Sequence, residues 1–375
     1  MRILIAPQEF KGTLTASEAA RAMEAGIRRA LPDAHFDVCP IADGGPGTVQ
    51  AFLDAVGGER RVARVHDPLG RPVDAAWALL GDGTAVIEMA AASGLALLRP
   101  EELDPRRAST FGTGELIRAA LDAGCRKVIV GVGGSATNDG GVGAASALGV
   151  RFFDRRGRPL PPGGAALARL SRIDLSERDP RLEDVDLLVA TDVTNPLYGP
   201  EGASVVYGPQ KGADEATARE LDAALARLAK VVERQLGVDL AFKPGAGAAG
   251  GLAYGLCVFC GARITPGFDL VAKGLDLSRR IGMADIVVTG EGRLDNQTLR
   301  GKGPGEIARR AKQRGVPTVA IAGVVDPSFD EGAGLFDEIV AATSPDEGVP
   351  ASRDDAFFRV ERAAERWARS LGARG

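Results

Sequence analysis

Carboxylates that follow apolar runs are the residues of this 375-residue sequence best suited to chemistry. Four such runs, typical of β-strands, are each followed by an aspartate within or beside a glycine or proline turn: Asp43, Asp139, Asp192 and Asp295. A single aspartate there is ordinary, because Asp forms turns and caps helices. Four converging carboxylates would repel one another unless a cation lay between them, and Mg²⁺ takes oxygen ligands together with substrate phosphates. The pattern therefore favours a site for a nucleotide and Mg²⁺.

The segment GVGGSATNDGG, residues 131–141, places one aspartate among five glycines directly after the apolar run KVIV. Glycines let backbone N–H groups close on phosphate oxygens, and the hydroxyl and amide side chains add neutral donors. On this interpretation Mg²⁺ or another cation offsets the charge of Asp139. The predicted phosphate ligands in this loop are Gly133, Gly134, Ser135, Thr137 and Asn138. The alternative is a tight turn at a helix start, with Asp139 as its N-cap.

Two further loops combine cations with carboxylates. Lys11 precedes a predicted helix start and the residues GTLT, so an ammonium, hydroxyls and backbone N–H groups can meet an anion there. The segment EGRLDNQTLRGKG carries Glu291, Arg293, Asp295 and Lys302. The Arg293 fork suits a carboxylate or phosphate. The predicted Mg²⁺ ligands are Asp139, Glu291 and Asp295. A solvated lysine and a structural ion-pair network are the alternatives for these loops.

The composition argues against several classes of protein. Charged residues make up 26% of the chain and give a formal net charge of −4, so no basic field attracts nucleic acid. No apolar run approaches the roughly 20 residues of a membrane span and no signal-peptide core is present, so we expect a cytoplasmic protein without a membrane partner. Four cysteines and two histidines predict neither a disulfide framework nor metal–histidine chemistry, and we interpret Cys257 and Cys260 as packing residues.

Two nucleotide-binding motifs offer alternatives to this interpretation. Gly131-x-Gly133-x-x-Ala136 follows a predicted strand, and Asp154 lies about 20 residues further on, as in a dinucleotide fingerprint. Asp139 would then face the pyrophosphate as a like charge, which argues against NAD. The GxxxxGK[ST] phosphate loop is absent from the sequence, because Asn296 stands where its first glycine belongs. If phosphate is transferred, another architecture does it.

The elements that must position these residues alternate between strands and helices at both ends of the chain. The predicted strands are RILIAP, FDVCPIA, DIVVTG, TVAIAG and FDEIVAAT. Thr15 and Glu18 match a capping box at the start of the first helix. Alternation predicts parallel pairing, because the chain must cross over to return to the same sheet edge. Five strands suffice for a flavodoxin-like open parallel sheet built from both termini.

The middle of the chain has strands and helices of its own, among them the strands AVIEMA, KVIVGV, VRFFD and DLLVAT. We therefore predict an α/β protein of two domains. Residues 1–66 with 280–375 form the flavodoxin-like domain, and residues 67–279 form an inserted α/β domain. Ligands of such open sheets bind beyond the carboxyl ends of the strands, where the loops described above lie.

Several segments resemble the signature segments of the bacterial type I glycerate kinases, in that family's order. They include IAPQEFKGTLTASEAA, ADGGPGT, GGSATNDGG, TDVTNPLYGPEGAS with YGPQKGA, and TGEGRLDNQTLRGKGP. The resemblance runs from Ile3 to about residue 325. It implies a two-domain enzyme that uses ATP to phosphorylate D-glycerate, commonly at the 2-hydroxyl, giving 2-phosphoglycerate. Gln8 and Glu9 stand where family members often have Asp-Ser, and Pro46 replaces a common Glu.

The resemblance implies roles in phosphoryl transfer, which needs positioned reactants and neutralised charge more than covalent chemistry. The predicted catalytic residues are Lys11, Asp43 and Asp192. Asp192, braced by Asn195, is expected to accept the proton of the glycerate hydroxyl. The residues expected to bind substrate or phosphate beside the glycine-rich loop are Asn195, Arg293 and Lys302. ATP and Mg²⁺ are the implied cofactors and D-glycerate the implied partner, while the oligomeric state stays open.

Two other functions are alternatives to the kinase. A non-catalytic sensor that kept the pocket would bind glycerate or nucleotide tightly without turnover, and replacement of Asp192 by Asn would leave its affinity unaltered. An NAD-linked oxidoreductase would bind nicotinamide, which a fluorescence titration detects. Turnover with ATP, Mg²⁺ and glycerate distinguishes the kinase from both.

Overall fold

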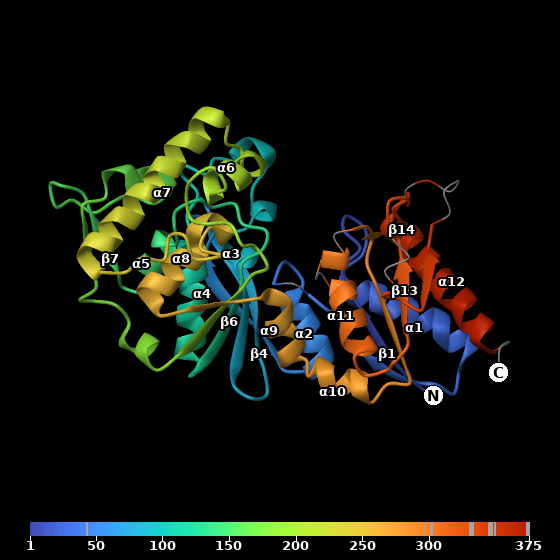
Figure 1. Cartoon of the computed structure of the whole chain (residues 1–375). Helices are drawn as coiled ribbons and strands as arrows, with labels where there is room; N and C mark the ends of the chain where they lie inside the picture. Colours follow the sequence, from blue (N-terminus) through green and yellow to red (C-terminus); the bar gives the residue numbers. More distant parts are fainter. Residues whose placement is uncertain are drawn as a thin grey trace. The chain divides into compact units, whose positions relative to one another are not determined.

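The computed structural model describes residues 1–42, 44–296, 298–300, 303–329, 334–343, 348 and 350–372. The chain divides into two compact units, and Figure 1 traces its course. The first unit comprises Met1–Ala42, Gln50–Gly57 and Phe268–Gly375, and the second comprises Asp43–Val49 and Gly58–Gly267. Both ends of the chain therefore contribute to the first unit.

The first unit is built on a parallel sheet, which has five strands among the described residues. These are β1 (Arg2–Pro7), β2 (His35–Val38), β11 (Ile286–Gly290), β13 (Thr318–Ala322) and β15 (Glu338–Ala341). Their order is β2-β1-β11-β13-β15, and each neighbouring pair is parallel. Numbered along the chain this is 2-1-3-4-5, the order of flavodoxin-like sheets. The predicted fold class, α/β with a flavodoxin-like open parallel sheet built from both termini, is confirmed.

Helices cover this sheet. Two short strands, β12 (Arg293–Leu294) after β11 and β14 (Val324–Val325) after β13, pair in parallel as a separate two-stranded sheet. The helices are α1 (Ala16–Ala30), α2 (Thr48–Val56), α9 (Gly267–Gly274), α10 (Leu277–Gly282), α11 (Gly303–Lys312) and α12 (Arg353–Gly372), with the 3-10 turn η6 (Thr298–Arg300). The predicted capping box of Thr15 and Glu18 is present at α1. α1 and α12 lie side by side, so closely that a Cβ on Gly26 would approach the Glu361 carbonyl oxygen to 2.1 Å (Figure 1).

The second unit contains a six-stranded sheet, formed within residues 59–265, all of which the structure describes. Its strands are β3 (Glu59–His66), β4 (Pro72–Leu79), β5 (Thr84–Glu88), β6 (Lys127–Gly131), β9 (Asp186–Ala190) and β10 (Arg263–Thr265). The order is β10-β9-β6-β5-β4-β3, parallel from β10 to β5 and antiparallel from β5 to β3. The parallel strands all end at one edge, so the loops after them are neighbours.

Helices and a hairpin complete the second unit. The α-helices are α3 (Ala90–Ser93), α4 (Phe111–Asp122), α5 (Val142–Ala147), α6 (Ala203–Tyr207), α7 (Glu215–Leu236) and α8 (Ala248–Cys260). The 3-10 turns are η1 (Leu95–Leu97), η2 (Pro100–Glu102), η3 (Gly164–Arg169), η4 (Pro180–Glu183) and η5 (Pro209–Lys211), and the hairpin is β7 (Arg151–Phe153) with β8 (Arg172–Asp174). α7 is capped at both ends, by the Asp214 side chain at Thr217 N and by Gly237 in the left-handed conformation.

The unit boundaries differ from the predicted domain boundaries in three places. Asp43–Val49, predicted for the flavodoxin-like domain, fall in the second unit. Residues 59–66, predicted for the flavodoxin-like domain, form β3 and pair with β4 in the second sheet. Residues 268–279, predicted for the inserted domain, fall in the first unit. That the two units fold as independent domains stays a prediction.

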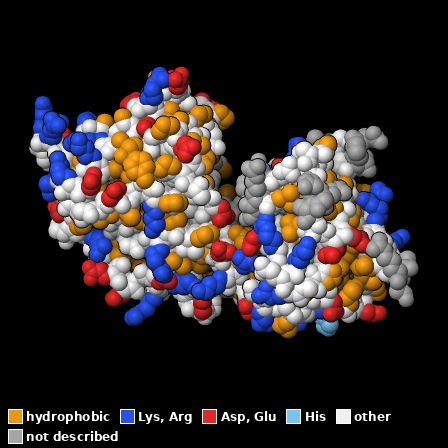
Figure 2. All heavy atoms as spheres, in the orientation of Figure 1, with side chains coloured by type: hydrophobic (Ala, Val, Ile, Leu, Met, Phe, Trp, Pro, Cys, Tyr) orange, Lys and Arg blue, Asp and Glu red, His pale blue; other side chains and the backbone are white. Residues whose placement is uncertain are grey.

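The remaining sequence features concern the cysteines and the surface. Cys39, Cys125 and Cys260 are buried thiols, and burial raises the pKa of Cys260 to about 12, as for a thiol that packs and does not react. Figure 2 shows Lys and Arg side chains interspersed with Asp and Glu on the visible face of each unit. Among the described residues, no helix combines the length and the apolar character needed to cross a membrane.

Candidate active site

The loops after β1 and β11 meet in the first unit. Pro7 and Gly290, the last residues of these strands, are register partners, and Gln8 N donates to Gly290 O at 2.8 Å. A Cβ on Gly292 would lie 3.1 Å from Lys11 N, so the two loops also pack against each other. The strand order reverses between β1 and β11, and open α/β sheets bind ligands at that point.

Lys11 lies at the exposed tip of the loop after β1. The buried side chains of Phe10 and Leu14 anchor the loop, whose backbone closes by Phe10 N donating to Leu14 O at 2.8 Å. Thr13 Oγ1 donates to Phe10 O at 2.8 Å, and Thr15 caps α1 directly afterwards. A short, internally bonded turn therefore presents the Lys11 ammonium in front of a helix start.

Glu291 and Asp295 are joined through one threonine in the loop after β11. Thr298 Oγ1 donates to Glu291 Oε1 at 2.6 Å, and Asp295 N donates to Thr298 Oγ1 at 3.3 Å. Both carboxylates are half-buried and come from one turn, and Asp295 also accepts the Thr298 backbone N–H on its own carbonyl. The Thr298 side chain thus links the Glu291 carboxylate to the Asp295 backbone within one turn.

Arg293 binds a protein carboxylate in this structure. Its guanidinium binds the Asp326 carboxylate through Nε, at 3.1 Å, and through Nη2. Hydrogen bonds from Ser328 and from Arg293 hold the pKa of Asp326 well below its usual range. This ion pair agrees with the structural alternative for Arg293, and its predicted contact with a substrate carboxylate or phosphate stays a prediction. Lys302, from the same segment, lies outside the described residues.

In the second unit, two glycine-rich loops pack backbone to backbone beyond the strand ends. Gly133 N donates to Gly44 O at 3.2 Å. A Cβ on Gly133 would lie 2.6 Å from Gly45 Cα, and a Cβ on Gly131 would lie 2.4 Å from Gly44 O. The close approach of the loop at Gly44 and Gly45 is therefore sufficient to explain why residues 131 and 133 are glycines. Asp43, which precedes Gly44, lies outside the described residues.

Only the first part of the loop after β6 reaches the surface. Gly134 is exposed with a φ of 73°, and Ser135 is 7% exposed. Thr137 and Asn138 are fully buried. Asn138 Nδ2 donates to Ser204 Oγ at 2.8 Å. Both side chains are enclosed in this structure, and their predicted contact with phosphate stays a prediction.

Asp139 is also enclosed. Its carboxylate accepts hydrogen bonds from Thr110 N at 2.8 Å, from Thr110 Oγ1 at 3.0 Å, and from Gly141 N and Gly143 N. Burial raises the pKa of Asp139, and these hydrogen bonds oppose the shift. The carboxylate thus binds the starts of α4 and α5 together. These contacts agree with the helix-start alternative, and the predicted role of Asp139 in Mg²⁺ binding stays a prediction.

Asp192 is exposed in the loop after β9, the strand next to β6. Its Oδ1 accepts the Gly267 N–H at 2.9 Å, which orients the carboxylate. Asn195 is half-buried and uses both ends of its amide within the unit: Nδ2 donates to Glu201 O at 2.8 Å, and Oδ1 accepts from Tyr207 OH at 2.8 Å. Asn195 therefore braces the Asp192 loop, and its predicted contact with substrate stays a prediction.

Glu88, the last residue of β5, was missed from the sequence. Its Oε1 accepts the Val49 N–H at 2.7 Å, and its carboxylate also bonds the Gly47 N–H. Thr48 Oγ1 closes the same turn on Gly45 O at 2.6 Å. Burial raises the pKa of Glu88. The carboxylate that ends the run AVIE was the available signal, because it occupies the same strand-end position as the predicted aspartates.

Lys211 was also missed as a functional residue. It is 1% exposed and donates from Nζ to Thr137 O at 2.7 Å, within the loop after β6. Burial lowers the pKa of Lys211 to about 7, and the negative charge of Asp139 opposes the shift. The signal was a lysine between helix-breaking residues in YGPQKGA, but nothing in the sequence indicates its burial.

The candidate residues therefore fall into two groups. The described members of the first unit are Lys11, Glu291, Arg293 and Asp295, and those of the second are Gly133, Gly134, Ser135, Thr137, Asn138, Asp139, Asp192 and Asn195. Within the part of the chain that the structure describes, no three His, Cys, Asp or Glu side chains group as metal ligands. Two carboxylates at Glu291 and Asp295 fit Mg²⁺, which often takes only one or two from the protein beside phosphate and water.

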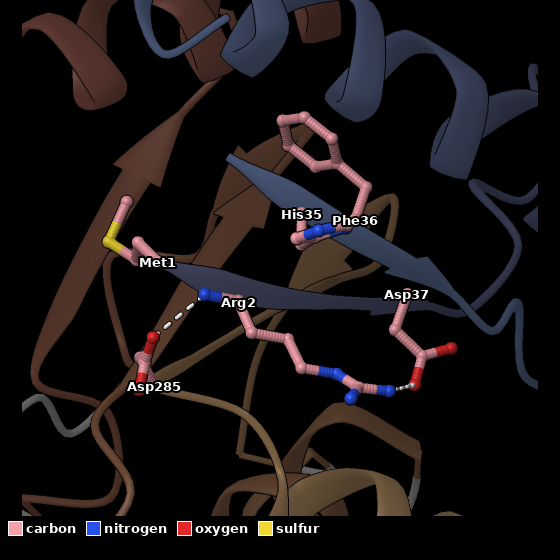
Figure 3. A pocket seen from close by; sticks show the side chains of 6 residues that line it. All are labelled: Met1, Arg2, His35, Phe36, Asp37 and Asp285. Atoms are coloured by element: carbon pink, nitrogen blue, oxygen red, sulfur yellow. Dashed lines mark hydrogen bonds and ion pairs between the residues drawn. The ribbon is translucent and has the colours of Figure 1, made fainter. Parts of the chain in front are cut away.

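A cavity of about 470 Å³ opens at the other edge of the first sheet, at the starts of β1 and β2 (Figure 3). Arg2 N donates to Asp285 Oδ2 at 2.7 Å, and Arg2 Nη2 lies 3.5 Å from Asp37 Oδ2. Both carboxylates of this cavity already have protein partners, and the cavity lies at the amino ends of the strands. It is therefore not part of the candidate active site.

Comparisons with known proteins cover nearly the whole chain. The model of the glycerate kinase family matches residues 3–372. A glycerate kinase of Halalkalibacterium halodurans is 48% identical over 370 residues, which is 98% of this chain and 97% of the relative. The glycerate 2-kinase of Escherichia coli K12 is 49% identical over 324 residues, 86% of this chain and 85% of the relative. A crystal structure from Salmonella typhimurium LT2, described as glycerate kinase 2, matches with a TM-score of 0.89 and 44% identity, covering 100% of this chain and 98% of that one.

Proposed function

The chain belongs to the glycerate kinase family, and we propose that it transfers the γ-phosphoryl group of ATP to D-glycerate, giving ADP and 2-phosphoglycerate. The observation that carries this proposal is the similarity along the whole chain to relatives named as glycerate kinases, including the glycerate 2-kinase of E. coli. The geometry supports it, because carboxylates and a lysine lie at the carboxyl ends of parallel strands in both units.

Asp192 is the proposed general base. Its carboxylate is exposed at the end of β9, and the Gly267 N–H fixes its orientation through Oδ1. A base so oriented accepts the proton of the glycerate hydroxyl as that oxygen attacks the γ-phosphorus. Asn195 holds the loop in place through Glu201 and Tyr207, so its contribution is to position Asp192.

Lys11 is the proposed cation for the anionic reactants. Its ammonium is exposed before the start of α1, at the reversal point of the first sheet, where a triphosphate or the glycerate carboxylate is attracted. Glu291 and Asp295 are the proposed Mg²⁺ ligands, linked through Thr298. Mg²⁺ bound there would neutralise phosphate charge during transfer. The exposed backbone at Gly134 and the Ser135 hydroxyl are the proposed phosphate donors of the second unit.

The roles of Asp43 and Lys302 stay predictions, as do the cytoplasmic location and the independence of the two domains. D-Glycerate is the proposed small-molecule partner.

Coupled measurement of ADP release with ATP, Mg²⁺ and D-glycerate tests the proposed reaction. We expect release that depends on glycerate, and phosphorus NMR of the product distinguishes 2-phosphoglycerate from 3-phosphoglycerate. A folded sample that releases no ADP above the background without glycerate would overturn the proposal. A 3-phosphoglycerate product would correct the position of transfer and leave the kinase assignment in place.

A further inference from the structure

Lys211 is a buried cation in the second unit that the proposed chemistry leaves unused. It ends η5, and 1% of its surface is exposed. Its Nζ donates to Thr137 O at 2.7 Å, 74 residues away in the chain. Lysine is almost never so deeply buried, because an ammonium loses its hydration there and a single hydrogen bond replaces little of it. A methionine of similar length would fill the same space without that cost.

The loop residues beside this contact carry further unfavourable features. Thr137 Oγ1 and Asn138 Oδ1 are buried and have no hydrogen-bond partner among the described residues. Burying a polar oxygen without a hydrogen-bond partner destabilises the folded state, because the oxygen gives up its hydrogen bonds to water. The buried lysine therefore contacts the same loop that carries these two oxygens. Costs concentrated in this way are typical of sites where function overrides stability.

The charge of Asp139 lies on the same loop. Asp139 is fixed to the starts of α4 and α5 by Thr110, Gly141 and Gly143. Its negative charge favours the protonated form of Lys211. Two buried ionisable groups are thus attached to residues 137–139, Lys211 from η5 and Asp139 from the loop itself. Any displacement of the loop alters this pair, so the pair resists displacement.

We propose that Lys211 is a positioning residue of the kinase reaction, which holds the buried half of the loop after β6 so that Gly134 and Ser135 meet the phosphate in a fixed geometry. Lys211 acts through the Thr137 carbonyl and does not touch the substrate. Asn138 and Ser204 provide a second anchor through the 2.8 Å bond between Nδ2 and Oγ. This inference rests on the proposed function, because it assigns the loop to phosphate.

Lys211→Met tests the inference, because methionine keeps the length of the side chain and removes both its donor and its charge. In a folded variant we expect kcat/KM for ATP to fall at least about tenfold, as misplaced binding groups lose transition-state stabilisation. Lys230→Met on the exposed side of α7 is the matched control, and its kinetics should equal those of the unaltered protein. A folded Lys211→Met protein with kcat/KM for ATP within twofold of the unaltered protein overturns the inference.

Amide hydrogen exchange supplies a readout that does not need activity. We expect residues 133–139 to exchange faster in Lys211→Met than in the unaltered protein, and unchanged exchange overturns the inference. If that variant does not fold, Ser204→Ala releases the second anchor and should produce the same kinetic and exchange changes to a smaller degree, and its failure to do so counts against the inference. Failure of the proposed function is separate, since it would appear as absent turnover in the unaltered protein.

Discussion

At the residue scale, three carboxylates at strand ends have different surroundings and therefore different roles. Asp139 is enclosed by backbone and hydroxyl donors, Glu88 holds a neighbouring turn, and Asp192 is exposed with one oxygen oriented by Gly267. All three follow or end an apolar run in the sequence, but they differ in burial: Asp139 is buried, Glu88 is partly buried and Asp192 is exposed. A carboxylate accepts a proton from a substrate hydroxyl only if the substrate can come within hydrogen-bonding distance of it, which favours Asp192 among the three.

Asp192→Asn should lower kcat by roughly 10²- to 10⁴-fold while KM for ATP changes little. Asparagine keeps Oδ1 as the acceptor of the Gly267 N–H, so the variant should fold. It has no basic oxygen, so it should not accept the hydroxyl proton. Coupled ADP release measures the effect. Asp184→Asn, at another exposed aspartate of the same unit, is the control and should leave kcat unchanged. Loss of less than tenfold in Asp192→Asn would show that another group accepts the proton.

Lys211 gives a pH dependence of stability whose sign follows from its burial. Burial lowers its pKa from 10.5 to about 7, so the unfolded chain binds more protons than the folded one between these values. The free energy of unfolding contributed by Lys211 therefore rises as the pH increases through this window. Urea denaturation of the unaltered protein and Lys211→Met at about pH 7 and about pH 10 measures it. The unaltered protein should gain stability relative to the variant, and a constant difference would contradict the pKa shift.

At the element scale, loops that the chain separates by about 90 residues shape one another at the edge of the second sheet. The turn at residues 44–49 is held by Glu88 from β5 and packs on Gly131 and Gly133 after β6. Each loop thus determines the other's backbone. The strength of this coupling can be tested from either side.

Glu88→Ala removes the acceptor of the Val49 N–H and should cost about 1 to 2 kcal/mol of unfolding free energy, as for loss of a helix cap. Because the turn at residues 44–49 then loosens against the loop after β6, the proposed phosphate-binding loop, KM for ATP should rise as well. Glu88→Gln keeps an acceptor and should restore most of both. Asp214→Ala removes the cap of α7 and should cost similar stability without any change in KM. Equal KM values in Glu88→Ala and Asp214→Ala would contradict the coupling.

Gly133→Ala tests the same interface by steric conflict. The added Cβ would lie 2.6 Å from Gly45 Cα, so one backbone must move. We expect a loss of about 1 to 3 kcal/mol in unfolding free energy, together with reduced kcat/KM. Gly81→Ala is the control, because no atom lies within 4 Å of its Cβ position and its φ is not left-handed. Thermal unfolding measures the stability of both variants. Equal stability would show that the two loops can move apart without a loss of unfolding free energy.

At the scale of the whole molecule, the alternation of strands and helices was sufficient to predict the flavodoxin-like sheet. Parallel pairing follows from crossovers, which the sequence displays directly. Residues 59–66 were misplaced because an antiparallel edge strand is specified by its partner β4, which lies on the other side of the predicted boundary. The local pattern carries no information on that choice.

The site was less predictable than the sheet, since side-chain partners are distant in the chain. Asp139 is enclosed by Thr110, 29 residues earlier, and Arg293 is bound by Asp326, 33 residues later. A strand-end position indicates that a side chain reaches the ligand-binding edge, but it does not indicate what already occupies its hydrogen-bonding groups. The family resemblance predicted the class of reaction because it depends on whole segments and not on single partners.

Ligand-induced stabilisation tests the proposed reactants on the intact chain without requiring turnover. A ligand that binds only the folded state raises the unfolding free energy by about 2.7 kcal/mol at a concentration 100 times its Kd. ATP with Mg²⁺ should raise the melting temperature, ATP with EDTA should raise it less, and NAD should not raise it. Glu291→Gln retains an acceptor for Thr298 but lacks the charge, so it should lose the part of the shift that Mg²⁺ provides. A Mg²⁺ effect of equal size in Glu291→Gln would place the metal elsewhere, and stabilisation by NAD in place of ATP would favour the oxidoreductase alternative.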